Sequence, residues 1–316
     1  MEKIAVLMTA YNESESDFCK ALDSICNQTY KDLHIYLLLD KPDNDLLDGL
    51  CSLYASNDNR VSYIKNEQNL GLVNSLNKLL NIVTEDYVTR MDADDVAELS
   101  RFESEMQFMK KHNLDFVTTE IDYIRDDKIE AGLSLPDVIG QDFADAQKEI
   151  NLSAHPTWLV KKEVYDKLRG YRNLSSCEDL DFVLRALQSG FRLGRLGKVT
   201  LHYRLRPDGI SYSHAYEQYA KTKVLMDMYR KGENIESLDV EALNHRFSTK
   251  KSESYSQKYA VSKALMESDV YILREDSKLK GALMMLLHLC NDSNYRNIFR
   301  DILKNKRALK RIKDNS

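Results

Sequence analysis

Three carboxylates follow a short strand-like segment, Tyr-Val-Thr-Arg-Met at residues 87–91. In an extended chain, residues two apart point to the same side, so we expect Asp92 and Asp94 to share a face while Asp95 turns toward the next segment. Carboxylates without a neighbouring His or Cys favour Mg²⁺ or Mn²⁺ over zinc, and such ions keep open positions for phosphate oxygens. The spacing predicts a metal site for a diphosphate; the alternative is that one Asp caps the next helix and the others are solvated.

The elements that must position these residues alternate between strand and helix. Apolar runs predict strands at 4–8, 34–39, 61–64, 87–91, 116–124 and 199–203. Apolar residues at helical spacing predict helices at 16–26, 46–55, 72–83, 99–112 and 178–189. This order predicts an α/β fold with a Rossmann-like, doubly wound and mostly parallel sheet.

Polar residues follow three of the predicted strands. Residues 9–12, Asp40 and residues 92–95 each stand where a strand ends. Ligands of such sheets bind beyond the carboxyl ends of the strands. We therefore expect these three segments to converge on one binding site.

Composition limits the class of protein. The chain has 316 residues, 43% apolar and 30% charged, with 4 Pro and 11 Gly, which is typical of a globular protein. The net charge of −5 gives no general attraction to nucleic acid, so an anionic ligand needs local charges or a metal. From about residue 215 glycine almost vanishes, which predicts a domain at 1–213 and a helical C-terminal region at 214–316.

Cysteine usage and apolar runs indicate a cytoplasmic protein. The five cysteines form an odd set without a Cys-x-x-Cys pair, so neither a zinc knuckle nor a disulfide framework is expected. The first apolar run is too short for a signal peptide. The longest later run, residues 282–287, is far shorter than the roughly 20 residues that span a bilayer.

Five segments, taken in order, resemble the inverting glycosyltransferases of family 2, which have the nucleotide-sugar-binding A-type fold. They are Met-Thr-Ala-Tyr-Asn-Glu at 8–13, Asn-Gln-Thr-Tyr-Lys-Asp at 27–32, Asn-Leu-Gly-Leu at 69–72, Arg-Met-Asp-Ala-Asp-Asp at 90–95 and Cys-Glu-Asp-Leu-Asp-Phe at 177–182. The resemblance covers about the first two thirds of the chain and rests on the order of the motifs. Residues 155–158, His-Pro-Thr-Trp, and residues 202–211 resemble bacterial members that assemble capsule or O-antigen polysaccharide.

The resemblance implies a nucleotide-sugar donor and a metal cofactor, Mn²⁺ or Mg²⁺. It places Asp92 at the donor, and Asp92 with Asp94 at the metal. The remaining donor-side residues are Thr9, Tyr11, Glu13 and Asn69, with Tyr11 packing on the base or ribose; for Tyr11 the alternative is ordinary packing.

One departure from the family pattern concerns the nucleotide. The family usually carries Asp-Asp-Gly-Ser after its second strand, whereas Leu-Asp-Lys-Pro stands at 39–42. Asp40 takes the position that the resemblance assigns to the nucleobase, and Lys41 replaces a small residue. UDP remains the expected nucleotide.

The same resemblance makes Asp179 the expected general base. An inverting transfer needs a carboxylate that removes the proton of the acceptor hydroxyl as its oxygen attacks the anomeric carbon. Glu178 is the second choice for this role and is otherwise expected at the acceptor. The structural alternative is that both belong to an acidic first turn of a helix, where negative charge is favourable in any case.

Other polar and aromatic residues complete the expected site. Arg204 and Arg206, in a loop with Pro and Gly, are expected to cover the donor phosphates, or else to be surface residues. His202 either completes the metal shell or has a structural role. We expect three ring-bearing residues to line the acceptor site: His155, Trp158 and Tyr171. For Trp158 the alternative is a place in the core.

The C-terminal segment is strongly basic. Cations at residues 304–313 alternate with Leu303, Ala308, Leu309 and Ile312, which is typical of an interfacial helix attracted to anionic lipid; the alternative is a solvated helix end. We therefore expect peripheral contact with the inner face of the membrane.

The expected function is transfer of a sugar from a nucleotide donor, UDP-linked, to a hydroxyl of a saccharide or lipid-linked saccharide. A sugar-nucleotide pyrophosphorylase is one alternative, although residues 9–13 lack its Gly-rich loop. A non-catalytic nucleotide-sugar or glycan-binding module is the other, and it would not need Asp179. Which sugar moves and which linkage forms depend on pocket shape.

Overall fold

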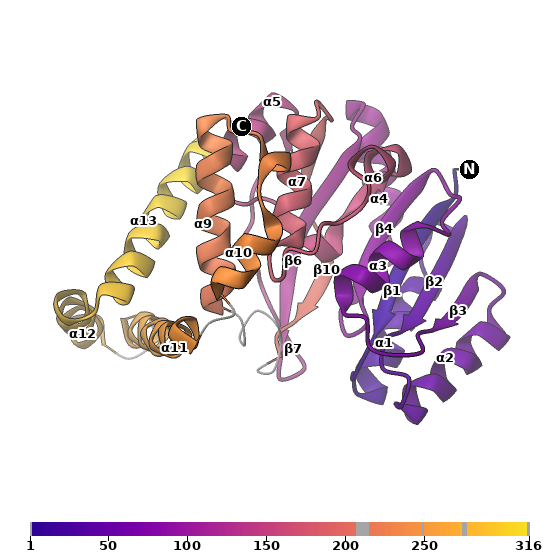
Figure 1. Ribbon diagram of the computed structural model, residues 1–316, viewed down its shortest axis with the longest axis horizontal. Coiled ribbons are helices and arrows are strands. Elements are labelled where there is room, and N and C mark those ends of the chain that lie inside the picture. The colour runs from indigo at the N-terminus through magenta and orange to yellow at the C-terminus, as the bar shows by residue number, and fades with distance from the viewer. Residues whose placement is uncertain (1, 207–214, 248–249, 274–276, 315–316) are drawn as a thin grey trace. The chain divides into compact units, whose positions relative to one another are not determined.

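A mixed, mostly parallel sheet organises the N-terminal part of the chain (Figure 1). The computed structural model describes residues 2–206, 215–247, 250–273 and 277–314. Within them the strand order is β3-β2-β1-β4-β9-β6-β10-β5, with β7 beside β6 and β8 beside β10. The strands are β1 Ile4–Ala10, β2 Leu33–Leu39, β3 Val61–Lys65, β4 Tyr87–Asp92, β5 Val96–Ala97, β6 Phe116–Arg125, β7 Lys128–Glu130, β8 Val138–Ile139, β9 Leu159–Lys161 and β10 Leu193–Arg204.

The parallel pairs follow the predicted βαβ alternation. Strand β1 lies parallel to β2 and β4, β2 to β3, and β6 to β10. Strand β9 is antiparallel to both of its neighbours, β4 and β6, and thereby joins the two parallel halves. The predicted fold class is confirmed.

The helices of this part connect successive strands. Helix α1 begins where Ser14 Oγ accepts the backbone N–H of Asp17 at 3.1 Å, and it buries Phe18, Leu22 and Ile25 on the face that the spacing predicted. The helices are α1 Glu15–Cys26, α2 Asp45–Asn57, α3 Leu72–Leu80, α4 Arg101–His112, α5 Gln141–Gln147, α6 Lys162–Leu168 and α7 Glu178–Gln188, with a 3-10 turn η1 at His155–Thr157.

Several element boundaries differ from the prediction. Strand β10 begins at Leu193 rather than 199. It pairs with β6 on both sides of an irregularity between Leu196 and Leu201, and the prediction included only the part that follows this irregularity. Helix α3 ends at Leu80 rather than 83. Strands β5, β7, β8 and β9 have only two or three residues each, and pairing with longer strands, rather than local periodicity, holds them.

The chain divides into two compact units. One comprises residues 1–173 and 178–206, and the other comprises 174–177 and 207–315. The predicted boundary between 213 and 214 lies outside the described residues. In the described part of the second unit the elements are helical, as predicted: α9 Ala215–Lys231, η2 Ile235–Ser237, α10 Val240–Phe247, α11 Lys250–Tyr271, α12 Lys278–Asn291 and α13 Ser293–Asp314.

The last helix packs part of the apolar face that the sequence predicted for an interfacial helix. In α13, Ala308 is buried, and Leu309 and Ile312 are half-buried, so this apolar face packs inside its own unit. Tyr295, also buried, donates from its hydroxyl to Asp269 of α11 at 2.6 Å. The basic side chains of the helix remain exposed, and so does Leu303, so membrane contact by this helix stays a prediction. Among the described residues, no helix is long and apolar enough to cross one.

Candidate active site

Three strand ends meet at one edge of the sheet, as predicted. In the β1 register, Thr9 lies opposite Leu38 of β2 on one side and Asp92 of β4 on the other. Just beyond, the backbone N–H of Asp40 donates to Ala10 O at 2.8 Å. The side chains after β1, β2 and β4 therefore surround a common space beyond their carboxyl ends.

The acidic segment after β4 is turned rather than extended. Strand β4 ends at Asp92, residues 93 and 94 form a turn, and the N–H of Asp95 donates to Asp92 O at 3.4 Å. The prediction that Asp92 and Asp94 share a face of a continuing strand is therefore wrong. Burial first, and then the charges of Asp92 and Glu13, raise the pKa of Asp94 to about 6. The two carboxylates after β4 therefore still lie within electrostatic range of each other.

Asp95 supports this turn from inside. Its side chain is fully buried, and Oδ1 accepts the backbone N–H of Arg204 at 2.9 Å. Its Oδ2 is buried without a hydrogen-bond partner among the described residues. Burial, followed by the charges of Asp92 and Asp94, raises the pKa of Asp95 well above its usual range. This carboxyl joins β4 to the end of β10.

The donor set fits a hard divalent cation that arrives with a substrate. Within the described ranges, no group of three or more His, Cys, Asp or Glu side chains is arranged to hold a metal ion alone. Mg²⁺ is commonly held by one or two carboxylates together with substrate phosphates and water. Asp94, with its raised pKa, and the neighbouring Asp92 are the residues that would hold it, since a cation offsets the repulsion between them.

Two arginines from the end of β10 reach the same loop. Arg204 Nε donates to Asp94 O at 3.1 Å, and its guanidinium pairs with Asp17 at 2.9 Å. Arg206 Nη1 approaches Asp94 Oδ2 at 3.4 Å. Both arginines therefore lie at the acidic turn, and neither is a distant surface residue. The remainder of the predicted flap, residues 207–211, lies outside the described residues.

The segment after β1 forms a rim with an exposed aromatic ring. Glu13 Oε2 accepts the backbone N–H of Tyr11 at 2.7 Å, and burial raises the pKa of Glu13. The Tyr11 ring is 46% exposed, with Lys41 Nζ 5.7 Å from its centroid. Lys41 also donates to Asn12 Oδ1 at 3.1 Å. An open ring beside a cation is compatible with stacking on a planar base, and the role of Tyr11 stays a prediction.

Asp40 organises the loop that opens α3. Its carboxylate accepts Asn66 Nδ2 at 2.7 Å and the backbone N–H groups of Leu70 and Gly71 at 2.8 and 2.9 Å. Asn69 Oδ1 accepts the same Gly71 N–H at 2.9 Å, and Asn69 is otherwise exposed. A carboxylate offers about four acceptor positions, so one remains for a base N–H. Asp40 thus has a structural role that the sequence did not reveal, and its contact with a nucleobase stays a prediction.

The second acidic pair begins α7. Glu178 and Asp179 are half-buried, and Asp179 Oδ1 accepts the N–H of Leu180 at 2.7 Å. Burial, then Asp179, and with a smaller effect Asp92, raise the pKa of Glu178 to about 7. Burial also raises the pKa of Asp179. Because Asp92 acts on Glu178, the pair lies within electrostatic range of the acidic residues at the end of β4.

Asp181, the third acid of that motif, has a different role. It is fully buried, and its carboxylate pairs with Arg172 and, at 2.8 Å, with Arg185 Nε. Arg185 in turn donates to the backbone oxygens of Leu168 and Gly170 at 2.9 and 3.0 Å. This ion-pair network fixes the first turns of α7, and so fixes the position of the acidic pair before it.

Arg90 is a site residue that the sequence reasoning missed. It is 3% exposed, its guanidinium pairs with Asp92, and its charge lowers the pKa of both Glu178 and Asp179. Its Nε is buried without a partner among the described residues. The available signal was a cation inside an otherwise apolar strand that is buried on both faces, since a buried charge needs a nearby counter-charge.

We expect Arg90→Ala to move the acid limb of the kcat/KM profile to higher pH by about 1 unit, because a nearby cation lowers carboxylate pKa values by about 1–3 units. Arg90→Lys keeps the charge and should restore most of the original profile. The profiles are measured as release of nucleoside diphosphate between mildly acidic and mildly basic pH. An unchanged profile in the Ala variant, with only a loss of stability, would show that Arg90 is purely structural.

The family of the chain follows from comparison with known proteins. Residues 5–169, more than half of the chain, match the family described as Glycosyl transferase family 2. The chain belongs to glycosyltransferase family 2. The Thr9 and Asp92 segments lie within the matched residues, and the Asp179 segment lies beyond them.

Individual relatives agree with this assignment, and a solved structure shares the fold. The glycosyltransferase is 30% identical over 208 residues to an uncharacterized glycosyltransferase, MJ1057, of Methanocaldococcus jannaschii, covering 64% of this chain and 70% of that one. It is 29% identical to the O-antigen biosynthesis glycosyltransferase WbnJ of Escherichia coli, covering 65% and 80%. A crystal structure of S. aureus TarS residues 1–349 with UDP-GlcNAc shares the fold, with a TM-score of 0.58, 16% identity and coverage of 99% and 90%.

The aromatic residues predicted at the acceptor are buried in this glycosyltransferase. Trp158 is fully buried, with its ring 4.7 Å from Phe116 and 5.8 Å from Phe182 between centroids. Its ring has no open face for a sugar, so the core alternative is correct and direct acceptor contact by Trp158 is not supported. His155 is 7% exposed, and its Nε2 lies 2.9 Å from the Tyr171 hydroxyl. Burial, then Arg90, lowers the pKa of His155 well below its usual value, which keeps it neutral.

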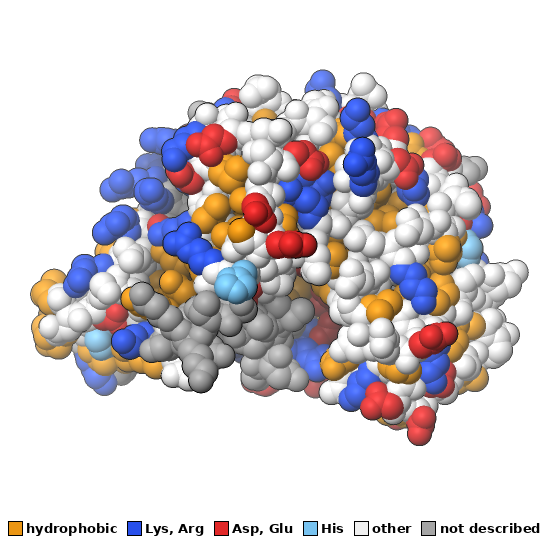
Figure 2. Space-filling model, in the orientation of Figure 1, with side chains coloured by type: hydrophobic (Ala, Val, Ile, Leu, Met, Phe, Trp, Pro, Cys, Tyr) orange, Lys and Arg blue, Asp and Glu red, His pale blue; other side chains and the backbone are white. Residues whose placement is uncertain are grey.

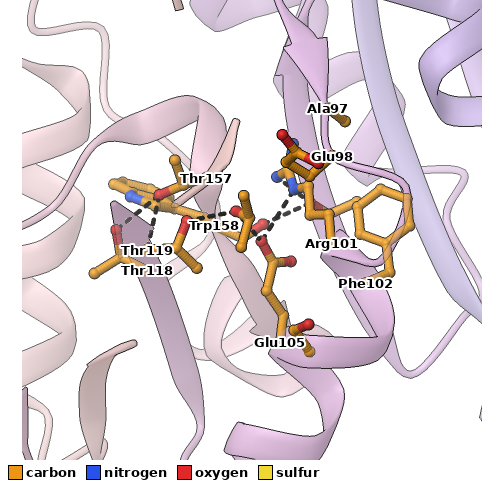
Figure 3. A network of polar contacts seen from close by, with 12 residues as sticks. Ala97, Glu98, Arg101, Phe102, Glu105, Thr118, Thr119, Thr157 and Trp158 are labelled. Carbon is orange, nitrogen blue, oxygen red and sulfur yellow. Dashed lines mark hydrogen bonds and ion pairs between the residues drawn. The ribbon is translucent and has the colours of Figure 1, made fainter. Parts of the chain in front are cut away.

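A buried polar network connects β4 to helix α4 and to the backbone at Trp158 (Figure 3). Arg101 of α4 donates from Nε to Glu105 Oε1 and from Nη2 to Thr89 Oγ1, both at 3.0 Å. Thr89 Oγ1 donates to the backbone oxygen of Trp158 at 2.6 Å. The core position of Trp158 and the end of β4 are therefore parts of one rigid support.

His202 belongs to a structural pair. Its Nε2 lies 2.7 Å from Glu98 Oε1, across the β10–β5 pairing. This contact agrees with the structural alternative and gives no support for His202 as a metal ligand.

Proposed function

We propose that this glycosyltransferase moves a sugar from a UDP-linked donor to an acceptor hydroxyl by direct displacement with inversion at the anomeric carbon. The observation that carries the proposal is the match of residues 5–169 to glycosyltransferase family 2, in a sheet whose β1, β2 and β4 ends bring Thr9, Asp40 and Asp92 to one edge. A single displacement requires the donor phosphates and the acceptor hydroxyl to be held together at such an edge.

The residues divide into three tasks in this proposal. Tyr11 and Asp40 hold the nucleotide, by stacking and by an acceptor for a base N–H. Asp179 removes the proton of the acceptor hydroxyl as the new glycosidic bond forms and the bond to the diphosphate breaks. Arg206, beside Asp94, offers a cation for the negative charge that the leaving diphosphate gains. When bound at Asp92 and Asp94, Mn²⁺ or Mg²⁺ supplies Lewis-acid stabilisation of that charge.

The acceptor class is proposed from the relatives. WbnJ is described as acting in O-antigen biosynthesis, and TarS has been solved with UDP-GlcNAc. We accordingly place the transfer on a lipid-linked glycan during synthesis of a bacterial surface polysaccharide, such as O-antigen or capsule, at the cytoplasmic side of the membrane.

The test incubates the full chain with a panel of nucleotide sugars, Mn²⁺ and saccharide acceptors. We expect release of nucleoside diphosphate with one UDP-linked donor, stimulated by acceptor, and an inverted anomeric configuration in the product by proton NMR. The measurement with donor alone sets the hydrolysis background, so acceptor stimulation separates transfer from leakage to water.

Three outcomes would contradict the proposal. Donor binding without release for any acceptor would point to a binding module. Formation of pyrophosphate from a nucleoside triphosphate would point to a pyrophosphorylase. A product of retained configuration would exclude the direct displacement.

A further inference from the structure

Helix α12 exposes a stripe of leucines along its whole length. Leu279, Leu283, Leu286 and Leu287 are 82%, 57%, 58% and 53% exposed, and Cys290 is exposed as well. Positions 279, 283, 286 and 290 recur at helical spacing, so their side chains lie on one face of the helix. We call these five residues the leucine stripe. Monomeric proteins expose single leucines commonly but seldom a continuous row.

The opposite face of α12 holds the helix in its own unit. Gly281 is buried, and a β-carbon there would lie 2.6 Å from the backbone of Leu273. His288 Nδ1 lies 2.7 Å from the buried Asp269 Oδ2 of α11. Residues 281 and 288 are on the side of the helix away from the leucine stripe. The stripe therefore faces outward because the other face is packed, and not because the helix is loose.

Strong positive charge accompanies the stripe. Residues 278–314, which form α12 and α13, contain ten Lys or Arg against three Asp or Glu, a formal charge of +7 in a chain of net charge −5. The rest of the chain thus carries −12. Figure 2 shows Lys and Arg gathered over α13 and hydrophobic side chains at α12. The exposed cations of one α13 face are Arg296, Arg300, Lys304, Arg307, Lys310 and Arg311.

The positive charge distinguishes between two partners that could bind the leucine stripe, a second copy of this chain and an anionic lipid surface. A second copy of this chain would bring another +7 segment against the first, and like charges oppose that contact. An anionic lipid surface supplies the opposite charge and, just beneath it, an apolar layer for the leucines. Lys278 and Lys280 stand beside Leu279, where long cationic side chains can extend to headgroups while the leucines enter the acyl boundary.

We propose that α12 is a membrane-docking helix that lies in the plane of an anionic bilayer, with the leucine stripe inserted and the basic face of α13 bound to headgroups. The helix has 14 residues, or about 21 Å at 1.5 Å per residue, which is shorter than a bilayer core and suits an interfacial position. The surface lies in the C-terminal unit, and the inference does not depend on which donor or acceptor the enzyme uses.

The test is flotation of the full chain with vesicles of phosphatidylcholine, with and without phosphatidylglycerol. We expect binding to the anionic vesicles that weakens as salt rises, because the cations are screened. Leu283→Glu/Leu286→Glu should weaken binding at least tenfold by removing the inserted side chains. Arg307→Glu/Lys310→Glu should also weaken it at least tenfold, since each cation near the surface contributes roughly fivefold.

A matched control adds the same two charges elsewhere. Leu46 and Leu53 of α2 are 51% and 53% exposed, so Leu46→Glu/Leu53→Glu should leave vesicle binding unchanged. Helicity and thermal unfolding check that each variant folds. A second measurement needs no change of charge. A polarity-sensitive dye is attached to Cys290 in a chain that carries Cys19→Ser and Cys26→Ser. Its fluorescence emission should shift to the blue when anionic vesicles are added.

Two results would overturn the inference. One is equal vesicle binding by the wild type and the stripe variant. The other is a wild-type chain that ignores anionic vesicles and sediments as a dimer, with Leu283→Glu/Leu286→Glu restoring the monomer, because a second copy would then cover the stripe.

Discussion

Asn in place of Asp179 is expected to lower kcat by about 10²- to 10⁴-fold with little change in donor affinity, because the side chain keeps its size but can no longer accept the acceptor proton. Burial raises the pKa of Asp179, and burial followed by the charge of Asp179 raises the pKa of Glu178 to about 7. A base acts only when ionised, so wild-type kcat/KM should fall as pH drops below neutrality. Transfer is measured by initial rates, and donor affinity by calorimetric titration.

Glu178→Gln is the matched control for Asp179→Asn. It removes one charge at the neighbouring position of the same helical turn, and with it a charge that disfavours ionisation of its partner. We expect Glu178→Gln to retain most of kcat and to move the acid limb to lower pH. If instead Glu178→Gln loses transfer and Asp179→Asn does not, the base is Glu178.

Asp94→Ala is expected to reduce transfer by about 10³-fold, since a Lewis-acid cation at developing phosphate charge contributes several kcal/mol. The variant should also bind Mn²⁺ far more weakly in the presence of UDP, as measured by calorimetry. Because the pKa of Asp94 is raised to about 6, a proton competes with the metal below that pH. Wild-type affinity for Mn²⁺ should therefore be full well above pH 6 and fall as the pH drops toward and below 6.

Asp127→Asn provides the comparison for Asp94→Ala. Asp127 is exposed and pairs with Arg204 at 3.3 Å, so its removal takes one negative charge from the neighbourhood without touching the expected metal ligands. We expect less than a twofold change in Mn²⁺ affinity for this variant, because exposed ion pairs contribute little. Equal Mn²⁺ affinity in Asp94→Ala and the wild type would refute the metal assignment.

The parallel part of the sheet could be predicted because its strands are locally distinct. β1 and β2 are almost wholly buried and read as continuous apolar runs between helices of clear periodicity. β9 has three residues, Leu159–Lys161, and is a strand only because β4 and β6 pair with it. No pattern in three residues specifies partners that lie far away in the chain.

The site was predictable to the level of which segments converge, and less so for individual roles. Asp92 and Asp94 were predicted from their spacing after a strand, and Asp179 was predicted from the family resemblance; their roles stay predictions. The support beneath them was not found, since the pairing of Arg90 with Asp92 and of Arg172 and Arg185 with Asp181 depends on tertiary packing. Trp158 was ambiguous for the same reason, because an aromatic side chain suits both a core and a sugar.

The antiparallel position of β9 also bears on how the nascent chain folds. β4 ends at residue 92 and β6 at residue 125, yet the strand that joins them spans residues 159–161. Until that stretch has left the ribosome, the facing borders of β4 and β6 have no neighbour and expose unpaired peptide groups, which are prone to associate with other chains. Synthesis thus passes through an interval in which β4 and β6 await the three-residue strand that pairs with both, and chaperone engagement should concentrate there.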